Sequence, residues 1–330
     1  MPLTIFLFLA SAGAIYLACE FFVNSIEWLG RRLNLTATAT GTVLAAFGTA
    51  LPESAVTFTA VALGRTPETR DLGVGSAVGG PLVLATIAYA VVGLTLLRSH
   101  RRASGKVAID QRRLSRDQGW FLAIFLCTAA LGLTTFAFKP WLAFVLVLAY
   151  ALYVWQEVRS GETAPEEELL EPLKLCPGAQ NPGWGWIILQ TVGAVAVIAG
   201  ASHIFVSQLE NLGAALHMAP HIVALLLSPV ATELPETMNA VIWVRQGKER
   251  LALANISGSM MIQATIPSAL GLYFTPWRFD ALLVAAGIVT LLAIIVLWAL
   301  FRRSAMTGRA LTLIGLLYAG FAAYVIWHFN

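Results

Sequence analysis

The sequence Thr49-Ala50-Leu51-Pro52-Glu53 returns, with changes, as Thr232-Glu233-Leu234-Pro235-Glu236 in the other half of the chain. Each copy places a proline and a carboxylate inside an apolar stretch that is long enough to cross a lipid bilayer. A charge at the bilayer centre costs about 2.5–3.5 kcal/mol or more, so an acid there is a candidate functional residue. Two such acids at matching places in two repeats predict an ion site between the halves.

The two prolines predict interrupted helices beside Pro52 and Pro235, because proline removes one helical hydrogen bond and frees the carbonyl four residues earlier. In lipid, a freed carbonyl has to face protein, a bound ion or a cavity. Glu53 and Glu236 would add anionic oxygens there, and oxygen ligands suit Na⁺, Ca²⁺ or Mg²⁺. A kinked helix with a buried, protonated glutamate is the structural alternative. The hydroxyls beside these carboxylates would be those of Thr49 and Thr232.

The next apolar stretch of each half, around 73–80 and 252–259, carries small residues at near-helical spacing. Small residues let two backbones approach closely, which is one interpretation of the pattern. The other is that polar side chains on these helices bring oxygens toward the glutamates, and the two interpretations are compatible. The polar side chains are Ser76, Asn255, Ser259 and Gln263.

The composition is that of an integral membrane protein. Of the 330 residues, 58% are hydrophobic and 12% are charged, whereas soluble domains carry about 25% charged residues. The first apolar stretch, 3–17, has no basic region before it and no small-residue cleavage pattern after it, so we expect a membrane helix rather than a signal peptide. The net charge of +3 does not indicate a nucleic-acid partner. No ATP-binding motif is present, so ion gradients would drive any transport.

Apolar stretches separated by short polar ones predict an all-α protein with ten transmembrane helices, five in each half. The first repeat is 1–160 and the second is 184–330. Between them, 161–183 is a predicted cytoplasmic acidic linker, whose run Glu166-Glu167-Glu168 is either a solvated face or a weak cation-regulatory site. The expected spans are 3–23, 36–64, 72–97, 118–136, 140–157, 184–210, 219–244, 251–273, 279–300 and 309–327.

The basic residues predict the orientation. With the N-terminus outside, 17 of the 21 Lys and Arg residues fall in inner loops. The positive-inside rule then places both termini outside and the linker in the cytoplasm, as for a multi-pass protein of a prokaryotic inner membrane. Five spans per half also give the two repeats inverted topology. Glu27 lies near the end of the first span, where we expect it to reach the surface or cap the helix.

The internal repeat can be followed residue by residue. From residue 22 to residue 64, loop included, the two halves share residues at a single offset of 183. One offset over such a length is hard to obtain by chance, so the halves are predicted to be structural repeats. Phe22, Val23, Glu27, Leu29, Gly30, Leu33, Thr49, Leu51, Pro52, Glu53 and Gly64 match Phe205, Val206, Glu210, Leu212, Gly213, Leu216, Thr232, Leu234, Pro235, Glu236 and Gly247.

At these residues the sequence resembles the calcium/cation antiporter superfamily, most closely its sodium/calcium exchanger branch. Each repeat of that family carries a Gly-Thr-Ser-Leu-Pro-Glu motif in one helix and a Gly-Ser-Asn-like motif in the next. The corresponding segments here are 48–53 and 231–236, followed by 79–84 and 258–263. The resemblance covers essentially the whole chain and implies an antiporter that carries inorganic cations across a lipid bilayer without a cofactor.

The resemblance also implies which residues form the site. The family's central cation site uses the two motif glutamates, the motif threonines and nearby carbonyls, and all four side chains are retained here. Its flanking sodium sites use motif serines and polar side chains of the Gly-Ser-Asn helices, and several of these are changed. Ala50, Gly80 and Glu233 stand where serine is usual, and Leu84 and Gln263 stand where Asn or Asp is usual.

Glu233 is the largest departure from the family pattern. It lies three residues before Glu236, so on a helix the two side chains share a face. Two carboxylates in a poorly solvated cavity do not easily ionise together, whereas a bound divalent cation would expel their proton. We therefore expect proton coupling here, with flux inhibited as the pH falls. The alternative is that Glu233 faces an inner vestibule, stays ionised and attracts cations.

The sequence thus predicts a secondary antiporter, not an enzyme, that exchanges Ca²⁺ or another hard cation for Na⁺ or H⁺. One alternative is a transport-inactive relative that acts as a cation sensor or scaffold. Another is a glutamate-dependent intramembrane hydrolase, which would need a positioned water and an electrophilic partner. Neither motif glutamate is accompanied in mid-membrane by a basic residue or a His-Glu pair at metal spacing, which disfavours the hydrolase.

Overall fold

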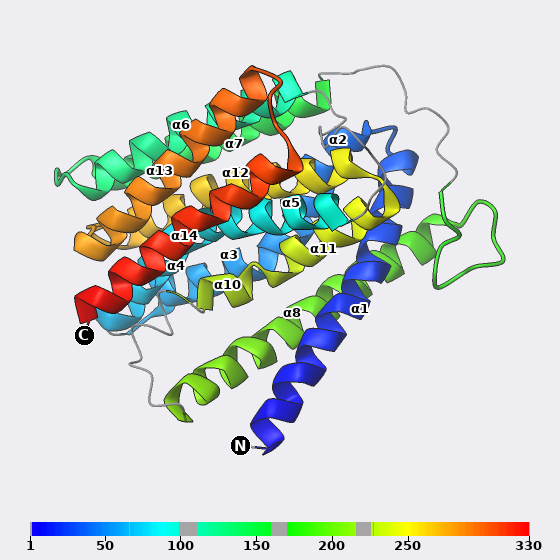
Figure 1. Cartoon of the computed structure of the whole chain (residues 1–330), viewed down its shortest axis with the longest axis horizontal. Helices are drawn as coiled ribbons and strands as arrows, with labels where there is room; N and C mark the ends of the chain where they lie inside the picture. Colours follow the sequence, from blue (N-terminus) through cyan, green and yellow to red (C-terminus); the bar gives the residue numbers. More distant parts are fainter. Residues whose placement is uncertain are drawn as a thin grey trace.

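The computed structural model describes residues 2–65, 67–98, 111–159, 170–215, 226 and 228–329, and its regular structure in these ranges is helical (Figure 1). The first half contains α1 (Pro2–Arg32), α2 (Ala37–Ala39), the π-helix η1 (Thr40–Ala45), α3 (Ala46–Leu63), α4 (Pro67–Val83), the π-helix η2 (Leu84–Ala88), α5 (Tyr89–Arg98), α6 (Gln111–Gly132), the short 3₁₀ helix η3 (Lys139–Trp141) and α7 (Leu142–Arg159). The second half contains α8 (Trp184–Ala215), α10 (Ser228–Thr232), α11 (Leu234–Gln246), α12 (Glu249–Phe274), α13 (Ala281–Arg302) and α14 (Gly308–Phe329).

The described helices coincide with the ten apolar stretches that the sequence shows, although 219–225 and 227 of the seventh stretch lie outside the described residues. Six of these helices are long and apolar enough to cross a membrane. The chain is therefore an all-helical membrane protein, and the number of ten spans stays a prediction. The six are Pro2–Arg32, Gly73–Arg98, Lys139–Arg159, Trp184–Ala215, Ala281–Arg302 and Gly308–His328.

Helix α12 forms the centre of the bundle. It contacts α3, α4, α6, α7 and α11, and its residues from Leu251 to Thr265 are all buried. A helix that is buried all round has no solvent-facing or lipid-facing stripe, so polar residues on it have to find partners inside the protein. This makes α12 the element on which polar chemistry from both halves can meet.

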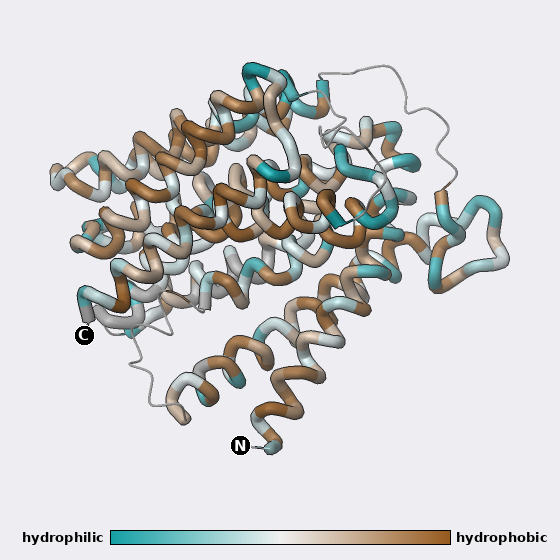
Figure 2. The backbone as a smooth tube through the Cα atoms, in the orientation of Figure 1, coloured by the Kyte–Doolittle hydropathy of each residue, from teal (hydrophilic) through white to brown (hydrophobic). Residues whose placement is uncertain are grey.

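The first helices of the two halves, α1 and α8, lie side by side along their lengths at one edge of the bundle (Figure 1). The rings of Phe8 and Phe205 stack between them, with centroids 4.5 Å apart. Much of the outer surface of the pair is apolar and exposed, as the hydropathy colouring shows (Figure 2). An apolar outer surface of this kind suits contact with lipid rather than water.

The described part of the linker is docked rather than freely solvated. Leu173 is fully buried and packs with Trp28 of α1 and Ile187 of α8. The Trp28 indole donates to the carbonyl of Glu171, with a distance of 2.9 Å. An apolar residue in an otherwise polar stretch explains the docking, which a count of charges does not reveal. The acidic run Glu166-Glu167-Glu168 lies outside the described residues.

Candidate cation site

The first acidic motif lies in a helix that continues through its proline. Helix α3 runs from Ala46 to Leu63, so the interruption expected beside Pro52 is wrong. The departure from α-helical geometry comes earlier, in the π-helix η1 that leads into α3. A proline inside a helix can be accommodated by a bend instead of a break, because only one hydrogen bond is lost. The backbone of Glu53 belongs to this helix, and its side chain lies outside the described part of the structure.

The second acidic motif lies at a one-residue interruption between two helices. Glu233 is the single residue between α10 and α11, with φ −85° and ψ 5°, and the interruption expected beside Pro235 is confirmed. Pro235 occupies the first turn of α11, where a missing N–H costs little because that N–H has no partner in the helix. Gly247 ends the same helix in the left-handed conformation, at φ 83°.

The two motif threonines make matching contacts. The Thr49 hydroxyl donates to the carbonyl of Ala45 at 3.2 Å, and the Thr232 hydroxyl donates to the carbonyl of Pro229 at 3.1 Å. A hydroxyl that donates to its own helix has its proton committed there and directs its lone pairs elsewhere. Both hydroxyls thus use their protons within their own helices, and hydroxyl oxygen is a donor type that suits hard cations.

Glu236 is buried in the first turn of α11, with 1% of its surface exposed. The positive end of the helix dipole favours a carboxylate at this position. The Asn255 amide of α12 donates to the backbone carbonyl of Glu236 at 3.3 Å. Asn255 thus reaches the backbone beside the acid, and its own amide oxygen has no hydrogen-bond partner among the described residues.

Glu233 faces α12 from the break in the second motif. The Gln263 amide donates to the Glu233 carboxylate at 2.6 Å, and both side chains are at most 1% exposed. In this conformation Glu233 does not face an aqueous vestibule. Gly80 of α4 lies against the pair: a Cβ there would be 2.9 Å from a Glu233 carboxylate oxygen and closer still to Gln263. Three of the five residues that depart from the family pattern, Gly80, Glu233 and Gln263, therefore lie together.

The polar residues of α12 form one stripe. Asn255, Ser259 and Gln263 recur every four residues, so they share a helix face, and all are buried. Asn255 and Gln263 contact the two ends of the Glu233–Glu236 turn, which places Ser259 between them along the helix. The Ser259 hydroxyl has no hydrogen-bond partner among the described residues. Ser76 of α4 is half-buried, and no described contact joins it to the stripe.

Two buried polar residues near the motifs were not singled out from the sequence. Asn239 lies one turn after Glu236 and is fully buried, and neither end of its amide has a partner among the described residues. Thr57 lies one turn after Glu53, is 1% exposed, and its hydroxyl is likewise without a described partner. Their spacing from the motif acids could have indicated them, because a polar side chain three or four residues after an intramembrane acid shares its helix face.

Close contacts between the halves surround these motifs. Gly79 of α4 approaches Pro229 of α10, and a Cβ on Gly79 would lie 2.9 Å from the proline ring. Gly258 of α12 approaches the backbone carbonyl of Thr42 in η1, again with no room for a Cβ. The helix that follows each acidic motif, α4 or α12, thus packs against the other half, just before the acidic motif of that other half. The close-packing interpretation of these small residues is confirmed, and the polar stripe of α12 coexists with it.

Comparison with known proteins decides the family. The family model described as sodium/calcium exchanger protein matches residues 3–157 and 186–327. The chain belongs to this family. A structure of the sodium-calcium exchanger NCX_Mj, soaked with Na⁺ and Sr²⁺, superimposes with a TM-score of 0.76 at 20% identity and covers 97% of this chain and 98% of that one. At this identity the match shows a shared fold.

Curated relatives from two bacteria agree with this membership. The putative antiporter CaxA of Alkalimonas amylolytica is 25% identical over 278 residues, covering 82% of this chain and 80% of its own length. The inner membrane protein YrbG of Escherichia coli K12 is 25% identical over 304 residues, covering 87% and 84%. The exchanger family is one of transporters rather than enzymes, so the prediction of a transporter from the sequence is confirmed.

The donor chemistry fits hard cations. No group of three His, Cys, Asp or Glu side chains comes together among the described residues. The polar groups that do gather in this part of the chain are carboxylates, carboxamides and hydroxyls, all of which offer oxygen. Oxygen donors suit Ca²⁺, Mg²⁺ and Na⁺, whereas zinc and copper sites use nitrogen or sulfur.

Proposed function

We propose that this member of the exchanger family is a secondary-active antiporter that moves Ca²⁺, or another hard divalent cation, in exchange for Na⁺ or H⁺ by alternating access. One observation carries the proposal: the motif helices α3 and α11 contact each other and both pack against the buried helix α12. Two helices that carry acidic motifs and pack against one polar, buried helix are what we expect of an ion site between two repeats. The relatives named as an antiporter and as a sodium-calcium exchanger support the same conclusion.

In this proposal, the transported divalent cation binds between the motifs. The carboxylates of Glu53 and Glu236 supply negative charge, and the threonine hydroxyls supply neutral oxygens. Ca²⁺ takes about six to eight oxygen ligands, so carbonyls freed by the two prolines and the amides of the α12 stripe would complete the shell. Ser76, Asn255, Ser259 and Gln263 are the candidates for the flanking positions. The ions are substrates, and the proposal needs no resident cofactor and no ATP.

The ion that is exchanged for the divalent cation is either Na⁺ or H⁺, and the presence of Glu233 supports H⁺. Its carboxylate is buried beside Gln263 and three residues from Glu236. Burial penalises a second negative charge near the first, so one proton shared by this pair is the favoured state without a divalent cation. Entry of a divalent cation restores the charge balance and releases the proton. This reciprocity would couple proton movement to cation movement.

The topology belongs to the same proposal. Two inverted repeats, 1–160 and 184–330, would give ten spans with both termini outside and the linker 161–183 in the cytoplasm. The concentration of Lys and Arg in the predicted inner loops supports this orientation. The printed name of the Escherichia coli relative, an inner membrane protein, supports the location.

A proteoliposome flux assay tests the proposal. Purified chain is reconstituted with Ca²⁺ outside, and uptake is measured under an outward Na⁺ gradient, a pH gradient or neither. We expect uptake that depends on one of the gradients and is lost in Glu236→Gln. Cation binding without gradient-driven uptake would identify a sensor or scaffold and overturn the proposal. Cleavage of a membrane substrate that requires Glu236, without uptake, would identify a hydrolase.

A further inference from the structure

A second polar region lies far from the acidic motifs along the chain, where α6 and α13 form a cavity of about 740 Å³. We propose that this cavity binds the headgroup of an anionic phospholipid. Its lining includes Arg112, Arg116 and Arg302, together with Trp120 and Trp298, and no Asp or Glu is among the described residues that line it. Basic pockets between transmembrane helices on the cytoplasmic side are suited to acidic lipid headgroups.

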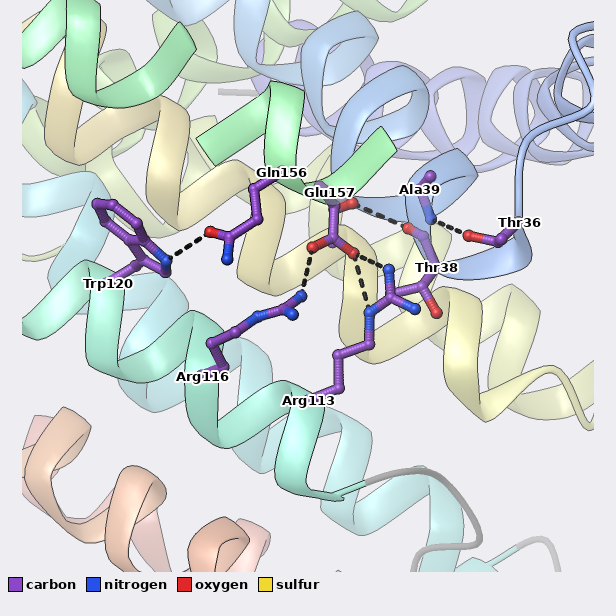
Figure 3. A network of polar contacts seen from close by, with 9 residues as sticks. Thr36, Thr38, Ala39, Arg113, Arg116, Trp120, Gln156 and Glu157 are labelled. Carbon is purple, nitrogen blue, oxygen red and sulfur yellow. Dashed lines mark hydrogen bonds and ion pairs between the residues drawn. The ribbon is translucent and has the colours of Figure 1, made fainter. Parts of the chain in front are cut away.

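Among the described residues around the cavity, arginines are more numerous than acids. Glu157 of α7 is paired with both Arg113 and Arg116, so a single carboxylate is shared by two guanidinium groups (Figure 3). Asp117, on the buried side of α6, adds at most one further negative charge. Among the described residues of this region, the four arginines therefore outnumber these two acids. An anionic ligand complements this excess.

The walls of the cavity are held in place by α7. The Trp120 indole donates to the Gln156 amide oxygen at 3.2 Å, and Arg116 pairs with Glu157 at 2.9 Å (Figure 3). On the other wall, the Arg302 guanidinium lies 5.0 Å from the centre of the Trp298 ring. Side chains fixed in this way lose little conformational freedom when a ligand binds.

The position of the cavity favours a lipid over a soluble anion. Arg302 ends the apolar helix α13, and tryptophan and arginine together are typical of the membrane interface. Beyond the tryptophans, the small residues Gly119 and Ala123 leave a strip of α6 open. The strip continues to Leu126 on α6 and Ile295 on α13, which are 54% and 45% exposed. A headgroup among the arginines would thus have its acyl chains along an apolar, exposed surface.

The test compares phosphatidylglycerol with phosphatidylcholine on the full-length chain in detergent, by native mass spectrometry. We expect wild type to bind phosphatidylglycerol more tightly. The double variant Arg112→Gln/Arg302→Gln should lower that affinity about 25-fold, from about fivefold per arginine near an anionic surface. The matched control, Arg303→Gln/Arg309→Gln, removes two exposed arginines outside the cavity lining and should leave the affinity unchanged.

A second variant keeps the arginines of the cavity and fills the cavity with a larger side chain. A Cβ on Gly119 would lie 3.6 Å from the Trp298 ring nitrogen, an ordinary contact, so Gly119→Ala is tolerated and Gly119→Leu occupies the cavity. We expect Gly119→Leu to lose lipid selectivity and Gly119→Ala to keep it. Equal binding of the two lipids by wild type, or equal losses in the arginine variant and its control, would overturn the proposal. Full competition by millimolar inorganic phosphate would also overturn it, since the site would then hold a free anion.

Discussion

The two acidic motifs differ most at their central positions, Ala50 and Glu233, and both positions meet α12. Ala50 is fully buried and packs in an apolar cluster with Ile262. Glu233 is equally buried and accepts a hydrogen bond from Gln263, the next residue of the same helix. Matching positions of the two repeats thus pack against adjacent residues of α12. The contact is apolar in the first repeat and polar in the second. The comparison shows that both motifs pack against the same helix, while the extra ionisable group is present on one side only.

The backbone follows the same asymmetry. The first motif lies in a continuous helix whose irregularity, η1, comes before it, whereas the second is broken at Glu233 itself. A break brings backbone carbonyls and amides to the site, and a continuous helix brings mainly side chains and the carbonyl freed by proline. The second motif therefore offers the larger choice of ligands. Substitutions in the two motifs and beside them test that difference.

The largest effect is expected where the two motifs are alike. Glu53→Gln and Glu236→Gln should each reduce cation flux about 100-fold or more, because removing one partner of a buried charge interaction costs about 3–5 kcal/mol. Flux in proteoliposomes measures this, with Glu171→Gln, an exposed acid of the linker, as the control. Wild-type rates in either glutamine variant would place the site elsewhere.

Glu233 is where the motifs differ, and its replacement should change coupling more than maximal flux. In wild type, flux should fall about tenfold as the pH drops from about 8.5 to about 6, because a larger fraction of the carboxyl pairs then carries the proton that the cation must displace. Glu233→Gln should flatten this profile, and Glu233→Ser should shift the driving ion toward Na⁺. Matching pH profiles in wild type and both variants would remove Glu233 from the coupling step.

Gly80 supports the second motif from the first half, so Gly80→Ala should disturb Glu233 and Gln263. Its Cβ would overlap both side chains, and overpacking of this kind costs about 1–3 kcal/mol. Gly75→Ala on the same helix is the control, since no atom lies within 4 Å of its Cβ position. Thermal unfolding in detergent should separate the two variants; equal melting temperatures would mean that the contact is not tight.

The two prolines should have unequal effects, and the smallest effect of all is expected at Pro235. Pro52→Ala restores a hydrogen bond inside a continuous helix and should stabilise the fold by up to about 3 kcal/mol while lowering flux, since a carbonyl is withdrawn from the site. Pro235→Ala changes the first turn of a helix and should alter stability by less than about 0.5 kcal/mol. Thermal unfolding and flux of the two variants measure the contrast. A larger stability change from Pro235→Ala than from Pro52→Ala would contradict a continuous helix at Pro52 and a helix start at Pro235.

Local signals in the sequence predicted much of this arrangement. Apolar length located the helices, the shared offset located the paired motifs, and four-residue spacing on an apolar helix placed Asn255 and Gln263 on one face. The break at Glu233 also followed from a local cause, a nearby proline. Each of these features depends on neighbours in the chain, which is why a single sequence contains them.

Features that depend on distant partners could not be predicted. Glu27 was expected near the surface, but it is buried, paired with Lys248 and bonded to the Trp243 indole at 2.9 Å. Those partners lie in the other half of the chain, beyond any local pattern. The π-helix η1 begins where Thr40 packs against Gly30 of α1, another tertiary contact. The side chain of Glu53 is outside the described residues, so the approach of the two motif carboxylates stays a prediction.

The glycine contacts between the halves have a consequence for biogenesis. Gly79 packs closely against Pro229, and Gly258 packs closely against the backbone of Thr42. Each half therefore needs a segment of the other half to fill its packing surface. During synthesis the first half is made before either partner residue of the second half exists. Its helices can insert, since each satisfies its own backbone, but their final packing has to wait for α10 and α12. The nascent protein therefore passes through a membrane-inserted, loosely packed stage that membrane chaperones and proteases can recognise until the second half arrives.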